Sequence, residues 1–138
     1  MSIANYSTDV PVTRTVGQIM GMLAEAGASS ITQNIHPGGA VADIEFGIRT
    51  ENGWRQYRMP VRVEGVHLAL QADRLPPRQQ TRPHAERVAW RIAHDWLRSN
   101  LALIDAGMAT LPEVMMPYTL VGGDQTAFEA YQQRELER

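Results

Sequence analysis

Alternating apolar and polar residues flank the pair Asn52-Gly53, and this pattern constrains the fold more than any other feature of the sequence. Asn-Gly favours the tight type I′ turn that joins two antiparallel strands. A two-residue turn here predicts that Glu51 lies opposite Trp54 and that Asp43 lies opposite Arg62. Six apolar residues would then share one side of the sheet, as a buried face requires: Ile48 with Tyr57, Phe46 with Met59, and Ile44 with Val61.

Capping signals place further elements around this hairpin. Thr15 and Gln18 form a capping box, which predicts that a first helix begins there and ends at Gly27. Similar boxes at Thr110 and Thr126 open two short C-terminal helices. The other predicted elements are strands over residues 31–35, 40–50 and 54–63 and a short helix over residues 64–72.

The longest predicted helix runs from Thr81 to Ala106, because apolar residues recur there with helical spacing and Gly107 follows. Four basic residues fall at spacings of four, three and four, which places them on one helical face: Arg87, Arg91, His94 and Arg98. We name these four residues the arginine row and expect the row to face solvent.

Together these elements predict an α+β fold in a single domain over residues 1–138. The expected order is a helix, a three-stranded antiparallel meander, a long helix packed on one sheet face, and small C-terminal helices. Residues 1–10 and 132–138 are predicted to fray. The Pro- and Arg-rich connector, residues 74–83, is predicted to be mobile and to pack no core.

The basic charge is concentrated in the middle of the chain. Residues 49–98 hold ten arginines against five acids, whereas residues 1–48 and 99–138 carry net charges of −3 and −4. The chain contains no lysine, so every basic side chain other than histidine is an arginine. Arginine favours planar, bidentate contacts with phosphate or carboxylate.

This charge distribution points to a candidate phosphate-binding surface, provided that the arginines meet on one side of the molecule. Trp54 at the hairpin tip adds a ring on which unpaired bases can stack. The alternative is a solvated face whose arginines pair with the chain's own acids, such as Glu86 and Asp95. The candidate residues are Arg87, Arg91, His94, Arg98, Arg58, Arg62, Arg78, Arg82 and Trp54.

Catalysis is not expected from this sequence. The absence of cysteine excludes disulfides, thiolate metal sites and a cysteine nucleophile. The four histidines lack the spacing of metal ligands, and no cofactor-binding or nucleotide-binding motif is present. Glu25, Asp43 and Glu45 suggest a metal-dependent nuclease, but the third strand lacks the acid and the lysine that this chemistry usually needs. We therefore expect no metal, no cofactor and no enzymatic activity.

A further observation concerns an ordered series of segments, residues 11–19, 27–28, 58–60, 89–91, 101–111 and 113–117. Together these segments resemble a family of short, uncharacterised proteins of tailed bacteriophages and prophages. The resemblance implies a phage or prophage origin and a bacterial cytoplasmic setting, but it assigns no activity and no site residues. No apolar run approaches the ~18 residues of a membrane span, and the N-terminus has no signal-peptide pattern.

The leading hypothesis is a small, non-catalytic nucleic-acid-binding protein that contacts phosphate through its arginines. The alternative is a protein-interaction module, either an inhibitor of a host factor or a phage accessory or assembly protein. Opposite charges on the middle and end segments favour self-association, and an uncovered sheet face favours a protein partner.

Overall fold

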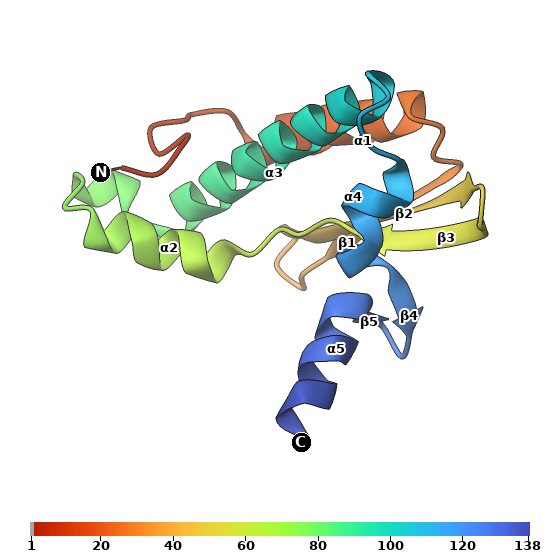
Figure 1. The fold of residues 1–138 in the computed structure, drawn as a ribbon. Coiled ribbons are helices and arrows are strands. Elements are labelled where there is room, and N and C mark those ends of the chain that lie inside the picture. The colour runs from red at the N-terminus through yellow and green to blue at the C-terminus, as the bar shows by residue number, and fades with distance from the viewer. Residues whose placement is uncertain (1) are drawn as a thin grey trace. The chain divides into compact units, whose positions relative to one another are not determined.

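The computed structural model describes residues 2–138 and has the predicted α+β class. An N-terminal helix precedes a three-stranded antiparallel sheet, and a long helix leads to small C-terminal elements (Figure 1). In chain order these are α1 (Val12–Glu25), β1 (Ser30–Ile35), β2 (Val41–Thr50), β3 (Gly53–Arg58), α2 (Val63–Ala72), η1 (Pro77–Gln79), α3 (Arg82–Asp105), α4 (Leu111–Met115), η2 (Met116–Tyr118), β4 (Leu120–Gly122), β5 (Gln125–Thr126) and α5 (Ala127–Leu136).

The chain divides into two compact units, each made of two separate segments. We call the first the helical unit; it contains the residues up to Gly21 together with Val61–Arg98. The second, the sheet unit, contains Met22–Pro60 together with Ser99–Arg138. Helices α1 and α3 therefore each belong to both units. The boundary between the units falls after Gly21 in α1 and after Arg98 in α3.

The core of the helical unit forms where α2 and α3 pack together. Leu70, Ala85 and Val88 are fully buried at its centre, and the partly buried apolar side chains around them are Ile3, Val63, Val66, Leu75 and Ile92. Leu75 belongs to the Pro- and Arg-rich connector, so the prediction that this connector packs no core is wrong. The connector also folds into η1, and the Gln80 side-chain amide donates a hydrogen bond to the carbonyl oxygen of Leu75.

Helix α1 begins three residues earlier than predicted. The carbonyl oxygen of Pro11 accepts hydrogen bonds from the amides of Arg14 and Thr15, so the helix is already formed where the capping box was expected. Thr15 is fully buried inside the helix rather than at its N-cap. The end of α1 is as predicted: Gly27 has a φ of +103° and its neighbour Ala28 donates to the carbonyl of Leu23.

The long helix α3 agrees closely with its predicted limits. The amide of His84 donates to the hydroxyl oxygen of Thr81, which caps the N-terminus. At the other end Gly107 has a φ of +75°, and Met108 donates to the carbonyl of Leu103 in the geometry of a Schellman motif. A glycine is favoured at this position because an L side chain is strained at positive φ.

The β2–β3 hairpin of the sheet unit differs from the prediction in register. Thr50 pairs with Gly53, and the loop residues are Glu51 and Asn52, which shifts β3 by two positions. A type I′ turn needs positive φ at both central residues, and Asn52 does not have it; Gly53 does, at +96°. The loop is therefore a turn followed by a left-handed glycine.

Because the shift is even, the paired residues of β2 and β3 keep their predicted sides of the sheet. Phe46 lies opposite Tyr57, with ring centroids 5.4 Å apart, and both residues are buried. Met59 takes the place opposite Ile44 that was predicted for Val61, and its amide donates to the carbonyl of Ile44. The predicted pairing of Asp43 with Arg62 is also wrong, because β3 ends at Arg58.

The C-terminal part of the sheet unit contains both predicted capping boxes. At Thr110 and at Thr126 the threonine hydroxyl accepts a hydrogen bond from the amide of a glutamate three residues later, and the glutamate side chain accepts one in return. The short β4–β5 hairpin was not predicted. Residues 132–136, which were expected to fray, belong to the regular helix α5.

Candidate nucleic-acid interface

The three arginines of the row have different surroundings in the helical unit. Arg91 donates from Nη1 to the side-chain oxygen of Gln18 at 2.6 Å and reaches the hydroxyl of Thr15 at 3.5 Å, so it bridges α3 to α1. Arg87 lies 3.2 Å from Nδ1 of His84, and Arg98 is exposed. Among the described residues, none of these three arginines forms an ion pair.

The contact of Arg87 depends on how His84 is oriented. Nε2 of the buried His84 lies 2.5 Å from the carbonyl oxygen of Tyr6. A carbonyl can only accept a hydrogen bond, so Nε2 carries the proton and Nδ1 is left to accept from Arg87. The carbonyl of Tyr6 thereby orients the imidazole of His84, which in turn accepts a hydrogen bond from Arg87. A neutral imidazole holds Arg87 without neutralising its charge.

His94 is not an accessible member of the row. Its residue surface is only 9% exposed, and its Nδ1 lies 2.9 Å from Oδ1 of Asp95. Asp95 also accepts a hydrogen bond from the side chain of Asn5. Burial alone would raise the pKa of Asp95, but the hydrogen bonds from Asn5 and His94 and the nearby charges of His94 and Arg91 together lower it.

The remaining predicted contacts of the helical unit fall into two groups. Arg82 is neutralised within the unit, because its guanidinium lies 2.5 Å from a carboxylate oxygen of Glu64 and 3.7 Å from one of Glu86. Arg62 and Arg78 are exposed and make no ion pair within residues 2–138. The predicted alternative, arginines tied up by the chain's own acids, therefore applies to Arg82 but not to these two.

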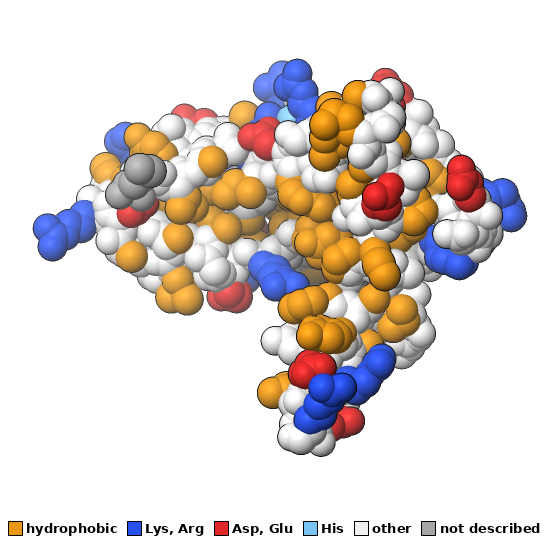
Figure 2. Space-filling model, viewed as in Figure 1, with side chains coloured by type: hydrophobic (Ala, Val, Ile, Leu, Met, Phe, Trp, Pro, Cys, Tyr) orange, Lys and Arg blue, Asp and Glu red, His pale blue; other side chains and the backbone are white. Residues whose placement is uncertain are grey.

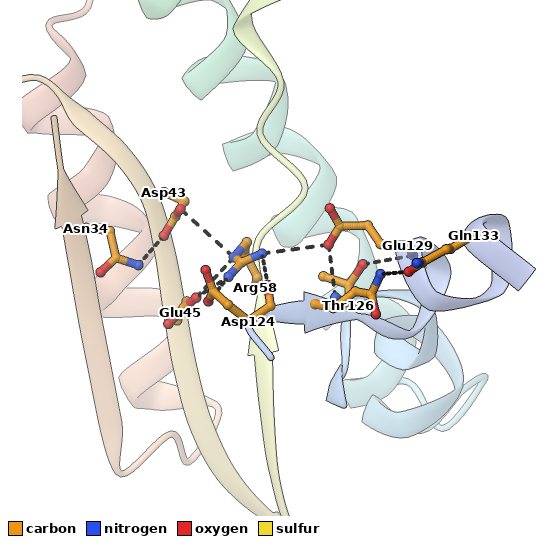
Figure 3. A network of polar contacts seen from close by, with 9 residues as sticks. Asn34, Asp43, Glu45, Arg58, Asp124, Thr126, Glu129 and Gln133 are labelled. Carbon is orange, nitrogen blue, oxygen red and sulfur yellow. Dashed lines mark hydrogen bonds and ion pairs between the residues drawn. The ribbon is translucent and has the colours of Figure 1, made fainter. Parts of the chain in front are cut away.

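Arg58 is the most heavily neutralised arginine and belongs to the sheet unit (Figure 3). Its side chain is only 18% exposed and lies 2.8 Å from Glu45, 2.5 Å from Asp124, 3.8 Å from Glu129 and 3.9 Å from Asp43. Burial alone would lower the pKa of Arg58, but the hydrogen bond to Glu45 and the charges of Asp124, Glu45 and Asp43 outweigh burial and raise it. A phosphate would have to compete with these carboxylates.

Trp54 also belongs to the sheet unit, where Gly47 makes room for its ring. A Cβ atom added to Gly47 would lie 2.1 Å from Cζ2 of Trp54, so the ring occupies the space that a side chain would need. The ring lies against the β2 backbone on the side of the sheet opposite Phe46 and remains 41% exposed. The signal that could have revealed this is a glycine in the middle of a strand, which often marks a close approach.

The predicted site residues therefore do not all share one unit. The helical unit contains Arg62, Arg78, Arg82 and the four residues of the arginine row, whereas Arg58 and Trp54 belong to the sheet unit. Formal charge follows the same division. The helical unit has eight arginines and five acids, a net charge of +3, and the sheet unit has five arginines and ten acids, a net charge of −5.

Residues that sequence reasoning missed include Thr15 and Gln18, which hold Arg91. Across residues 2–138 no three histidine, aspartate or glutamate side chains are grouped as ligands of a metal ion. None of the described helices combines the length and the apolar character needed to cross a bilayer. Comparisons of the chain with protein-family models, with curated proteins and with solved structures found no match.

Proposed function

We propose that this protein is a small, phage-encoded, non-catalytic nucleic-acid-binding protein that uses Arg87, Arg91 and Arg98 to contact phosphate. One observation carries the proposal: these three arginines of α3 form no ion pair with the described residues, in a unit whose net charge is +3. Unpaired guanidinium groups attract phosphates through Coulomb forces and counterion release. Binding would then be sensitive to salt and largely independent of base sequence.

Not all of the candidate arginines are proposed to contact phosphate. Arg62 and Arg78 are exposed and serve as secondary contacts. Arg58 and Arg82 contribute little, because each already has carboxylate partners within 4 Å. His94 is buried and makes no proposed contact with phosphate. Its role is to hold the carboxylate of Asp95 by a hydrogen bond.

The test compares two double variants that lose the same charge. Arg87→Ala/Arg91→Ala removes two proposed contacts, and Arg134→Ala/Arg138→Ala removes two exposed arginines from the C-terminal end of the sheet unit. Binding to duplex and single-stranded oligonucleotides is measured over a series of salt concentrations. The first variant should lower the slope of log affinity against log salt by about two on duplex DNA. Equal slopes for the two variants, or no binding by the native protein at low salt, would refute the proposal.

A protein-interaction module is the second candidate, and exposed apolar side chains near the C-terminus favour it. Elements η2 and β4 both contact α5, and hydrophobic side chains gather at the start of α5 (Figure 2). Val121 is 55% and Tyr131 57% exposed, and the rings of Phe128 and Tyr131 are tilted to each other by 36° with centroids 6.4 Å apart. Exposed apolar patches of this kind mark contact surfaces. Light scattering that finds oligomers without oligonucleotide binding would favour this function over the first.

A further inference from the structure

The sheet unit contains a cavity of about 620 Å³ that the proposed function does not use. It opens where the end of α3 and the start of α4 meet the β2–β3 turn, and its size is typical of small-molecule sites, ~300–1,000 Å³. All residues that line the cavity belong to the sheet unit. Those of α3 and α4 lie in Ser99–Arg138, and those of β2 lie in Met22–Pro60. The cavity is therefore a feature of one compact unit.

The interior of this cavity is apolar. Ile48 reaches it from the buried face of β2, and Leu101 and Ile104 reach it from the last turns of α3. Leu111 completes this interior from the first turn of α4. The left-handed Gly107 ends α3 and Thr110 caps α4, so the chain turns a corner beside the cavity, where Leu101, Ile104 and Leu111 are only partly buried. An apolar group can bind here by burying that surface.

The rim of the cavity is charged and mainly acidic. Glu51, Asp105 and Glu113 contribute three carboxylates, against the single guanidinium of Arg49. Glu113 is committed to the capping box of α4, where its Oε1 accepts from the amide of Thr110. Within the described part of the chain, Glu51 and Asp105 form neither an ion pair nor a side-chain hydrogen bond. Two carboxylates at the mouth of an apolar cavity thus lack a cation.

We infer that this cavity binds an organic cation with an apolar body, meaning an amine or guanidine attached to a hydrophobic group. The apolar body occupies the space between Ile48, Leu101 and Ile104, and the cation lies between Glu51 and Asp105. Charge complementarity selects this ligand, because the rim has an excess of carboxylates and the unit has a net charge of −5. An anion with the same apolar body would meet unfavourable charge. The inference is independent of nucleic-acid binding by α3.

The test uses three probes of similar shape at neutral pH: 2-phenylethylamine, which is a cation, 2-phenylethanol, which is neutral, and 3-phenylpropionate, which is an anion. Each probe is titrated into the full-length protein labelled with nitrogen-15, and the amide shifts are followed by NMR. The amine should bind about fivefold more tightly than the alcohol, as two exposed ion pairs allow. The shifts should be confined to the residues that line the cavity. Equal affinities for all three probes, tighter binding of the anion, or shifts located elsewhere would overturn the inference.

Two matched double variants separate the rim from the overall charge. Glu51→Gln/Asp105→Asn should remove the preference for the amine and leave the affinity for the alcohol unchanged. Glu135→Gln/Glu137→Gln makes the same change of charge on exposed residues near the end of α5 and should preserve the preference. An equal loss in both variants would assign the effect to net charge and would overturn the site. Unchanged NMR spectra away from the substitutions show that each variant is folded.

Discussion

Two arginines, one in each unit, show how differently the same side chain behaves in this molecule. Arg91 in the helical unit contacts the neutral side chains of Gln18 and Thr15 and forms no ion pair with any described residue, whereas Arg58 in the sheet unit has four carboxylates within 4 Å. Arginine content therefore does not determine whether a guanidinium is available to a ligand. The acidic side chains that the fold places beside a guanidinium determine whether it is available. Acids are fewer in the helical unit, whose net charge is +3, than in the sheet unit, whose net charge is −5.

The largest expected effects come from the two cores. Leu70 in the helical unit and Ile44 in the sheet unit are both fully buried, so Leu70→Ala and Ile44→Ala should each lower the free energy of unfolding by about 2–5 kcal/mol. Because α1 and α3 run through both units, each variant should unfold in a single transition. Denaturant titrations followed by circular dichroism and by tryptophan fluorescence provide the measurement. Two separate transitions, each shifted by only one variant, would show that the units are independent.

The next effect tests the role of Arg58 in the sheet unit. Arg58→Ala leaves Asp43, Glu45 and Asp124 without their shared cation, two of them with side chains at most 25% exposed. The free energy of unfolding should fall by about 1–3 kcal/mol, between the values for exposed and for buried ion pairs. Arg55→Ala is the matched control, since Arg55 is exposed, donates a hydrogen bond to the neighbouring carbonyl of Trp54 and forms no ion pair with the described residues. If both variants lost the same free energy of unfolding, Asp43, Glu45 and Asp124 would not depend on the charge of Arg58.

A smaller effect is expected from Gly47→Ala. The added methyl group collides with the ring of Trp54, which is exposed enough to move away, so the free energy of unfolding should change by only about 1 kcal/mol. Quenching of tryptophan fluorescence by acrylamide should increase, and this increase should vanish when Trp54→Phe is added. Oligonucleotide affinity should not change if only the helical unit binds. A clear loss of affinity would assign Trp54 to the binding surface and weaken the distinction between the units.

The smallest effect concerns Asp95, whose pKa is lower in the folded protein than its ordinary value of 3.8. A lowered pKa stabilises the fold above the unfolded value, and this contribution disappears as the pH falls through the folded value. Asp95→Asn should therefore remove roughly 0.5 kcal/mol of stability at neutral pH, because the side chain is 54% exposed, and progressively less as the pH falls below 3.8. The same variant should tighten oligonucleotide binding, since it removes a negative charge near Arg91. Weaker binding would contradict the role proposed for α3.

Much of the fold could be predicted because local signals agree with tertiary structure in several places. The capping boxes at Thr110 and Thr126 and the glycine ends of α1 and α3 depend only on nearby residues, and all are present as predicted. The buried face of the β2–β3 hairpin could also be predicted, since a two-residue error in register preserves it. The register itself could not be predicted, because it depends on the backbone angles of Asn52 and Gly53. An Asn-Gly pair favours the angles of a type I′ turn but does not determine them.

The candidate site was harder to predict because contacts between distant residues control it. Asp124 neutralises Arg58 across 66 positions of the sequence, and Gln18 holds Arg91 across 73. Neither contact leaves a periodic signal. The burial of His94 was missed for a related reason: its helical spacing matches the arginine row, but its ring bonds to the neighbouring Asp95 and lies within the packed side of α3.

The division of the chain into interleaved segments limits how this protein can be dissected. Each unit is built from an early and a late portion of the polypeptide, so no single truncation of the gene yields either unit alone. Ending the chain after Pro60 removes Val61–Arg98 from the helical unit and Ser99–Arg138 from the sheet unit. Separating the basic unit from the acidic unit requires new linkers that reconnect the portions of each, because a chain shortened from either end that keeps one unit whole also keeps part of the other.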